Sequence, residues 1–213
     1  MHVKGSRVGI IGGSIAGCSA AIALERLGCQ VEVFERSSGT LRDRGSGIAA
    51  PLALRDELIE AGYLPAGYPS CEMAWRHWFI ADGSPGGRRL WEQPNIAAMN
   101  NWGVLWRSLR ASVPDARYHD GTAVTEVRRD ADGQRVTIRF GDGSCQIFDV
   151  VIGADGYRSE VRTALHPASQ ATYSGYVLWR GNFAETALSD RALIDRLDSV
   201  HAWLTVCFDG GTA

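Results

Sequence analysis

The sequence lacks a long apolar run and an excess of charge of either sign. Its 213 residues carry 22 Lys and Arg against 24 Asp and Glu, a formal net charge of −2. A basic surface for nucleic acid or an anionic membrane is therefore not expected. The apolar stretch near the N-terminus, residues 8–11, is ended by Gly12 and Gly13. It is too short for the core of a signal peptide or for a membrane span.

Paired cysteines and clustered histidines are also missing. The five cysteines are scattered, odd in number and free of CxxC spacing. This pattern argues against a disulfide framework or a zinc site and favours free thiols in a reducing compartment, so we expect a cytoplasmic protein without a bound metal. The five histidines are isolated from one another, and no catalytic base stands out.

The first third of the chain has the pattern of a strand–helix–strand unit. Residues 8–11 are apolar, residues 15–27 have helical character with Gly28 suited to the cap, and residues 30–34 alternate as a second strand. This order is typical of a parallel sheet. Further on, residues 37–47 have loop composition. We expect helices at 52–61, capped by Gly62, and at 102–113, with a hairpin over 71–91 around the turn at 82–87.

The pattern changes at Ala123. Three strand-like runs, 123–129, 135–140 and 145–152, are separated by Asp-Gly pairs at 132–133 and 142–143, which favour hairpin turns, and together they predict a β-meander. The last run ends in an apolar stretch, 150–153, suited to a parallel sheet buried on both faces. A short helix at 158–165 follows. Strands at 176–183 and 201–208, with a helix near 189–197 between them, are expected to begin a second domain.

A glycine-rich loop joins the first strand to the first helix. It reads Gly12-Gly13-Ser14-Ile15-Ala16-Gly17, with serine at the usual middle glycine. Such a turn places backbone N–H groups and the positive helix end against a pyrophosphate. Gly12 permits the tight turn and Gly17 permits close packing. Glu35 ends the second strand, about 20 residues on, where a carboxylate binds ribose hydroxyls and repels a 2′-phosphate. The loop therefore predicts FAD or NAD, and not NADP.

A second motif, residues 153–162, reads GADGYRSEVR and resembles the GADGxxSxVR element of the flavoprotein aromatic hydroxylases. Segments at 33–37, 45–48, 106–109 and 176–181 resemble further elements of that family in the same chain order. The strand before Asp155 should run parallel to the first strand, so that its carboxyl end opens onto the crevice at Gly12. Ser159 can cap the helix that follows.

The resemblance implies an α/β fold: a Rossmann-like FAD-binding domain with a β-meander, plus the start of a β-sheet substrate domain. We assign residues 1–170 to the first, with substrate-side insertions near 65–100, and residues 171–213 to the second, which is truncated. The expected cofactor is FAD, with NAD(P)H as co-substrate. The residues expected to bind the cofactor are Gly12, Gly13, Ser14, Ile15, Ala16, Gly17, Glu35, Arg36, Arg44, Arg107, Asp155 and Gly156.

The activity implied is hydroxylation of a small, electron-rich aromatic or N-heteroaromatic ring, with a hydroxypyridine as one candidate, using NAD(P)H and O₂. A homodimer of the full-length protein is the oligomer considered. The family's later Gly-Asp element does not follow Gly156. We therefore expect the fragment alone to be inactive and residues 150–152 to form a sheet edge. The alternatives are another FAD-dependent oxidoreductase of the same fold and a non-catalytic nucleotide-binding fragment.

Overall fold

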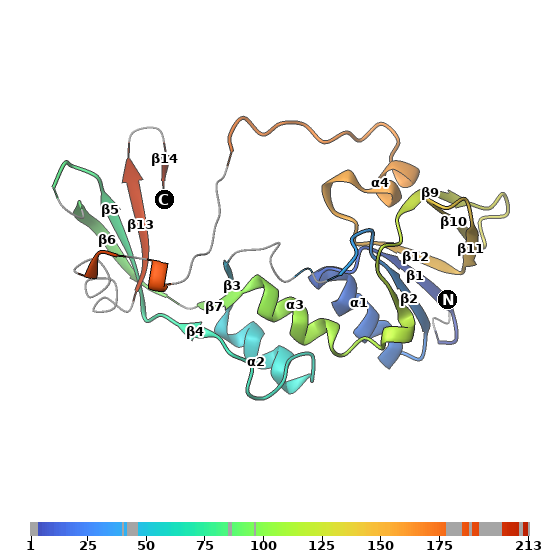
Figure 1. The fold of residues 1–213 in the computed structure, drawn as a ribbon, viewed down its shortest axis with the longest axis horizontal. Coiled ribbons are helices and arrows are strands. Elements are labelled where there is room, and N and C mark those ends of the chain that lie inside the picture. The colour runs from blue at the N-terminus through green and yellow to red at the C-terminus, as the bar shows by residue number, and fades with distance from the viewer. Residues whose placement is uncertain are drawn as a thin grey trace.

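The computed structural model describes residues 4–39, 41, 47–84, 87–95, 97–177, 185–187, 189–191, 202–208 and 211–212. Figure 1 shows two lobes joined by a helical middle region. One lobe surrounds a parallel sheet near the N-terminus, and the other is a sheet that contains the last described strands. No helix within the described ranges has the length and apolar character that crossing a membrane requires.

The first lobe is built on a four-stranded parallel sheet in the order β12-β1-β2-β8. Its strands are β1 (Arg7–Ile11), β2 (Gln30–Phe34), β8 (Tyr118–His119) and β12 (Val150–Gly153). The register pairs Val8 with Val31 on one side and with Val150 on the other. The predicted βαβ unit and the parallel last strand are confirmed. Among the described residues β12 pairs only with β1, so it is an edge strand.

Each face of this sheet is covered by a different layer. Val8 and Ile10 point into a core shared with α1 (Ile15–Arg26), α3 (Trp102–Arg110) and part of α2 (Leu52–Glu60). Ile11 and Phe34 point to the opposite face, where they pack against the meander and α4 (Glu160–Leu165). Because neighbouring side chains of a strand point to opposite faces, apolar residues in succession bury both sides of the sheet.

The meander consists of β9 (Val124–Arg129), β10 (Val136–Phe140) and β11 (Cys145–Phe148), paired in antiparallel fashion. The run 145–152, predicted as one strand, is two strands in the structure. It breaks at Asp149, whose carboxylate and N–H bind the N–H and carbonyl of Arg7. These bonds turn the chain out of the meander, and β12 then joins the parallel sheet.

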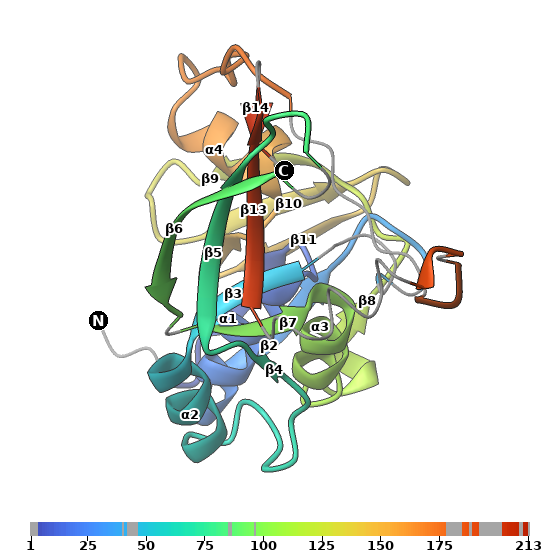
Figure 2. The same ribbon diagram turned by 90° about the vertical axis from the view of Figure 1, so that its left-hand side faces the viewer.

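The second lobe is a four-stranded sheet in the order β14-β13-β5-β6. β5 (Trp75–Ile80) and β6 (Arg88–Pro94) form the predicted hairpin, and β13 (Ala202–Phe208) runs parallel to β5. β14 (Gly211–Thr212) is paired with β13. Figure 2, which faces this lobe, shows β13 lying along β5. Residues 75–94 thus share a sheet with a strand more than 100 positions later in the chain.

A small antiparallel sheet and two helices lie between the lobes. The sheet has the order β3-β7-β4, with β3 (Gly47–Pro51), β7 (Ala97–Asn101) and β4 (Cys71–Glu72). The predicted helices at 52–61 and 102–113 are confirmed as α2 and α3, the latter ending at Arg110. Gly28 and Gly62 follow their helices with φ of 81° and 69°, as expected of helix-ending glycines.

Some expectations fall on residues outside the described ranges. They are most of the predicted strand 176–183, most of the predicted helix 189–197, and Arg44 with part of the loop around it. Three short single-turn helices complete the described elements, at Asp115–Arg117, Gly156–Arg158 and Glu185–Ala187.

Candidate functional site

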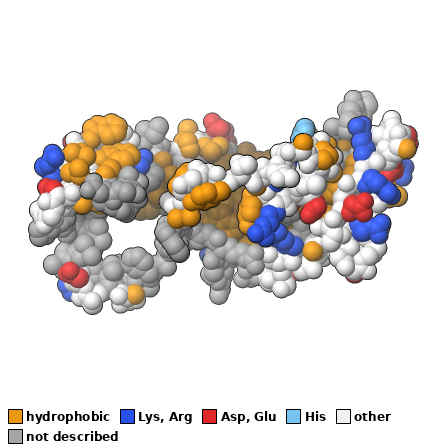
Figure 3. Space-filling model, turned by 90° about the horizontal axis from the view of Figure 1, so that it is seen from above, with side chains coloured by type: hydrophobic (Ala, Val, Ile, Leu, Met, Phe, Trp, Pro, Cys, Tyr) orange, Lys and Arg blue, Asp and Glu red, His pale blue; other side chains and the backbone are white. Residues whose placement is uncertain are grey.

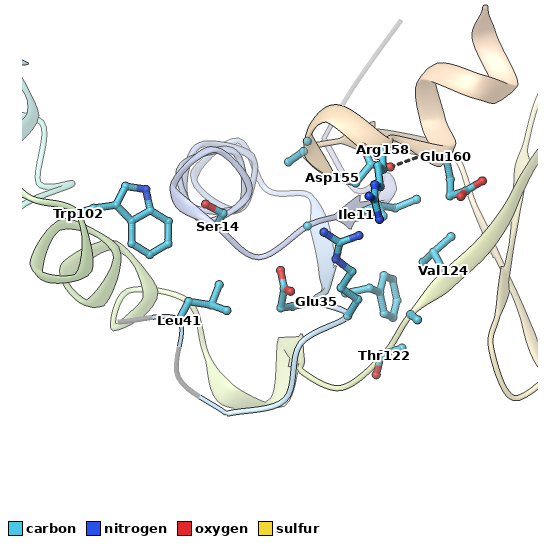
Figure 4. Close-up of a pocket in the computed structure, with 16 residues that line it drawn as sticks. Ile11, Ser14, Glu35, Leu41, Trp102, Thr122, Val124, Asp155, Arg158 and Glu160 are labelled. Carbon is cyan, nitrogen blue, oxygen red and sulfur yellow. Dashed lines mark hydrogen bonds between the residues drawn. The ribbon is translucent and has the colours of Figure 1, made fainter. Parts of the chain in front are cut away.

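A cavity of about 310 Å³ opens where the carboxyl ends of β1, β2 and β12 meet. In Figure 4, Ser14 from the start of α1, Glu35 from the end of β2 and Asp155 from the end of β12 surround it. Three segments far apart in the sequence meet here because parallel strands place their carboxyl ends at one edge of the sheet. The expectation that the second motif opens onto the crevice at Gly12 is confirmed.

Gly12 makes the turn that closes this edge. Its φ is +100°, and a Cβ there would stand 2.3 Å from the carbonyl oxygen of Ala154. A Cβ on Gly17 would stand 1.8 Å from the carbonyl oxygen of Gly12. The two glycines therefore let three backbone segments approach more closely than any side chain allows.

Ser14 is the N-cap residue, directly before α1, and its side chain makes no capping hydrogen bond. The first helical bond in this turn is donated by Cys18 N–H to the carbonyl of Ser14, at 2.9 Å. The amides that precede Cys18 in the first turn therefore have no acceptor within the helix. Together with the Ser14 hydroxyl, they form a set of donors suited to an anion at the positive helix end.

Glu35 is buried, with 8% of its surface exposed. One carboxylate oxygen accepts from Gly13 N–H and the other from Ser37 N–H, each at 2.9 Å. A carboxylate has about four acceptor positions, so capacity for hydroxyl donors remains on the cavity side. The side chain thus braces the glycine loop and also lines the cavity.

The second motif is held by its own side chains. Asp155 Oδ2 accepts from the N–H groups of Glu160 and Val161, at 2.7 and 3.4 Å, at the start of α4. Ser159 accepts from Arg162 N–H at 2.9 Å, which confirms the predicted cap. The Arg162 guanidinium donates to the carbonyls of Gly156 and Tyr157. These bonds fix the turn that carries Asp155 to the cavity.

The twelve residues expected to bind a cofactor fall into four groups. Gly12, Ser14, Glu35, Arg36, Asp155 and Gly156 line the cavity. Gly13, Ile15, Ala16 and Gly17 lie in the loop and first turn behind it. Arg107 lies elsewhere, in a separate depression with Leu64, Pro65 and Ala111. Arg44 is outside the described residues.

Several lining residues were not anticipated from the sequence. They are Ile11, Phe34, Leu41, Trp102, Thr122, Ala123, Val124, Ala154, Arg158 and Glu160. Arg158 lies within the second motif, directly after Gly156 and Tyr157, and this position could have identified it as a cavity residue. Trp102 and residues 122–124 carry no local signature, because their place at the cavity depends on how α3 and β9 pack.

Two buried groups behind the loop have raised pKa values. Burial raises the pKa of the Cys18 thiol to about 11, with Arg110 opposing the rise and Glu35 adding to it. Burial likewise raises the pKa of the Tyr118 hydroxyl, with Cys18 and Glu35 adding to the rise. Both groups are therefore protonated donors at neutral pH. Within the described residues, no three His, Cys, Asp or Glu side chains lie close enough together to hold a metal ion.

The surface differs between the two lobes. Figure 3 shows hydrophobic side chains gathered on the lobe at the left and along the hollow at the centre, with charged side chains spread over the lobe at the right. Exposed Trp75, Leu90 and Trp91 belong to β5 and β6 on the left lobe.

Comparison with known proteins gives consistent matches. Residues 7–62 match the family model of the pyridine nucleotide-disulphide oxidoreductases. The chain is 33% identical to 2,6-dihydroxypyridine 3-monooxygenase of Paenarthrobacter nicotinovorans over 177 residues, 82% of this chain and 42% of that protein. It is 32% identical to a 3-amino-4-hydroxybenzoate 2-monooxygenase of Streptomyces platensis, over 88% of this chain and 49% of that protein.

A solved structure extends the match to the fold. 2,6-Dihydroxypyridine-3-hydroxylase from Arthrobacter nicotinovorans superposes with a TM-score of 0.82 at 28% identity, over 97% of this chain and 50% of that chain. The chain spans about half the length of the relatives it matches.

Proposed function

The chain belongs to the flavoprotein aromatic hydroxylases, and we propose from this that it binds FAD and serves a monooxygenase that hydroxylates an electron-rich aromatic or N-heteroaromatic ring. The observation that carries the proposal is the meeting of Gly12, Glu35 and Asp155 at one cavity. NAD(P)H and O₂ are the proposed co-substrates.

The residues that line the cavity fit the chemical groups of FAD. Gly12 lines the cavity with backbone alone, so a pyrophosphate could approach the loop there without meeting a side chain. Ser14 and the free amides at the start of α1 would hold the phosphates. Glu35 would accept hydrogen bonds from the hydroxyls of the adenosine ribose, and Arg36 lines the same end. These donors and acceptors suit a dinucleotide without a 2′-phosphate.

The other end of the cavity is assigned to Asp155, Gly156 and Arg158. Asp155 is fixed by the amides of α4, so its carboxylate is held at the cavity independently of any ligand. Arg158 adds a cation within reach of an incoming phosphate. Arg44, beyond the described residues, and Arg107, in its separate depression, are also proposed to contact the pyrophosphate.

When bound, FAD would supply the redox chemistry of hydroxylation, with NAD(P)H as the reductant and O₂ as the oxidant. The chain's own task is to bind and orient the cofactor and to limit water near it. Trp102, Phe34 and Leu41 contribute apolar surface to the cavity for that purpose. The ring hydroxylated is proposed to be a hydroxypyridine or an aminohydroxybenzoate, by analogy with the relatives.

We also propose that the full-length protein forms a homodimer. A cytoplasmic location is also proposed, supported by cysteines that are scattered, odd in number and without CxxC spacing.

The visible spectrum of the purified protein tests the assignment. After incubation with FAD and removal of free cofactor, we expect flavin absorption bands that track with the protein. Addition of a hydroxypyridine should then accelerate NAD(P)H oxidation if the chain studied contains all that turnover needs. Failure to retain FAD under any condition would contradict the cofactor assignment. If FAD is retained but the hydroxypyridine does not accelerate NAD(P)H oxidation, only the nucleotide-binding role is supported.

A further inference from the structure

The carbonyl of Gly13, in the middle of the glycine loop, accepts hydrogen bonds from three side chains. Trp106 Nε1–H donates at 2.9 Å, the Tyr118 hydroxyl at 3.0 Å and the Cys18 thiol at 3.3 Å. A carbonyl oxygen has two lone pairs, so two strong donors and a weak thiol saturate it. Most loop carbonyls bind water or backbone; this one is held by side chains.

The two strong donors come from distant parts of the chain. Trp106 lies on α3 and is 4% exposed, while Tyr118 lies on β8 and is 9% exposed. Each ring is fixed by a neighbour. Trp102 stacks on Trp106 with ring centres 6.5 Å apart and planes 7° from parallel, and the Arg110 guanidinium lies 4.0 Å from the centre of the Tyr118 ring. The donors are therefore held in place before any ligand arrives.

The rest of Gly13 is fixed as well. Its N–H donates to Glu35, and a Cβ at this position would meet the Tyr118 hydroxyl at 2.2 Å. Glycine is thus required for Tyr118 to reach the backbone. Both polar groups of Gly13 are committed to buried partners, so the loop has little freedom to rotate.

The carbonyl of Gly13 and the N–H of Ser14 belong to one peptide group. No cis peptide occurs among the described residues, so the two bonds point in opposite directions. Holding the oxygen towards the core aims the Ser14 N–H the other way, and Ser14 lines the cavity. Hydrogen bonds accepted by the oxygen also polarise the peptide group and strengthen its N–H as a donor.

We propose that Trp106 and Tyr118 are positioning residues for the phosphates of the bound dinucleotide. By holding the Gly13 carbonyl, they aim the Ser14 N–H and the first turn of α1 into the cavity, and neither side chain touches the ligand. The proposal rests on the dinucleotide-binding function proposed above. It adds to that function a set of donors in the core that determines how the glycine loop presents its amides.

The test uses Tyr118→Phe and Trp106→Phe, which remove one donor each and keep an aromatic ring. The chain offers a matched control for each. The Tyr68 hydroxyl and the Trp78 Nε1 are buried and have no hydrogen-bond partner among the described residues. Tyr68→Phe and Trp78→Phe therefore make the same chemical change away from the loop. All four variants and the double variant Trp106→Phe/Tyr118→Phe are measured in the purified protein.

Each test variant should bind FAD about fivefold more weakly, because a loop released by the loss of one net hydrogen bond must be ordered again when the ligand binds. The double variant should lose more than the product of the two, since the buried carbonyl keeps only the weak thiol donor. The same loss should appear for ADP and be absent for adenosine, because only ADP carries phosphates for the loop amides. A purely structural effect would lower both affinities together, and that result would overturn the proposal.

Amide hydrogen exchange of the peptide that covers residues 13–17, measured without ligand, separates this proposal from the proposed function. Exchange should be faster in the test variants and unchanged in the controls. If the parent protein binds no FAD, the cofactor assignment fails, and exchange still decides whether the donors hold the loop. If FAD binds normally to the parent protein and to all variants, with unchanged exchange, the positioning role is wrong and the cofactor assignment stands.

Discussion

Glu35 is the residue at which loop structure and ligand binding meet. Its two oxygens accept from Gly13 and Ser37, and its remaining acceptor capacity faces the cavity. Glu35→Gln keeps the size and places an NH₂ group against one of these backbone donors. We expect FAD affinity to fall at least about tenfold, because each hydrogen bond to a charged group is worth roughly 1.5–3 kcal/mol.

Equilibrium titration of flavin fluorescence measures this change. Glu60→Gln, on the exposed face of α2, is the matched control and should leave the affinity unchanged. An unaltered dissociation constant for Glu35→Gln, with a lowered melting temperature, would restrict Glu35 to bracing the loop.

Cys18 gives the protein a specific sensitivity to alkaline pH. Burial raises the pKa of its thiol from 9.0 to about 11, so the folded state favours the protonated form. The resulting stability is fully present below pH 9 and is lost as pH rises from about 9 to about 11. With each pKa unit worth about 1.4 kcal/mol, the loss is about 3 kcal/mol.

Urea unfolding of the parent protein, Cys18→Ala and Cys145→Ala at pH values across this window tests the prediction. Cys145 is exposed and serves as the control. The free energy of unfolding should fall less steeply with pH in Cys18→Ala than in the other two. Equal slopes in all three proteins would show that Cys18 does not carry this dependence.

At the scale of elements, the contact between β12 and α4 determines where Asp155 lies. A Cβ on Gly153 would stand 2.7 Å from Cβ of Val161, so Gly153→Ala must push α4 away from the strand. We expect a loss of about 1–3 kcal/mol of stability, as for other overpacked contacts, together with weaker FAD binding. Thermal unfolding and flavin titration measure the two effects.

Gly67→Ala is the control for this variant, because nothing lies within 4 Å of the Cβ it would add. It should change neither quantity. If Gly153→Ala lowers stability and leaves FAD affinity intact, then the turn at Asp155 is dispensable for binding.

At the scale of the whole molecule, residues 166–177, which follow α4 in the direction of the second lobe, lie outside helices and strands. The side chains of residues 166–177 are exposed, among them Tyr173 and Tyr176 at 75% and 69%. Exposed chain outside regular elements is where proteases cut first. Brief chymotrypsin digestion should therefore cleave after Tyr173 or Tyr176 before it cleaves at buried Tyr68 or Tyr118.

Mass spectrometry of the first products identifies the cut, and Tyr173→Ala/Tyr176→Ala should slow it. We expect FAD to remain with the N-terminal product, because the cavity residues all precede the cut. Initial cleavage within residues 7–34, the first βαβ unit, would contradict this view of how stability is distributed.

Much of the first lobe was predictable from the sequence because its signals are local. The glycine loop, the Asp-Gly hairpin turns and the Ser159 cap each depend on residues a few positions apart, and Glu35 follows the loop within one strand–helix–strand unit. The apolar run 150–153 likewise indicated a strand of a parallel sheet, and the structure pairs it with β1. The predicted meander needed one correction, at Asp149, where bonds to Arg7 end one strand and start another.

The tertiary structure alone decided which distant residues complete the site. The pairing of β13 with β5 and the addition of two-residue β8 to the sheet have no local signature. Trp106 and not Arg107 faces the glycine loop, because the turn of α3 that packs against α1 presents the tryptophan to the core. Sequence spacing specifies conformations over a few residues, whereas the hydrogen bonds from Trp106 and Tyr118 to the Gly13 carbonyl join residues about 90 to 105 positions apart.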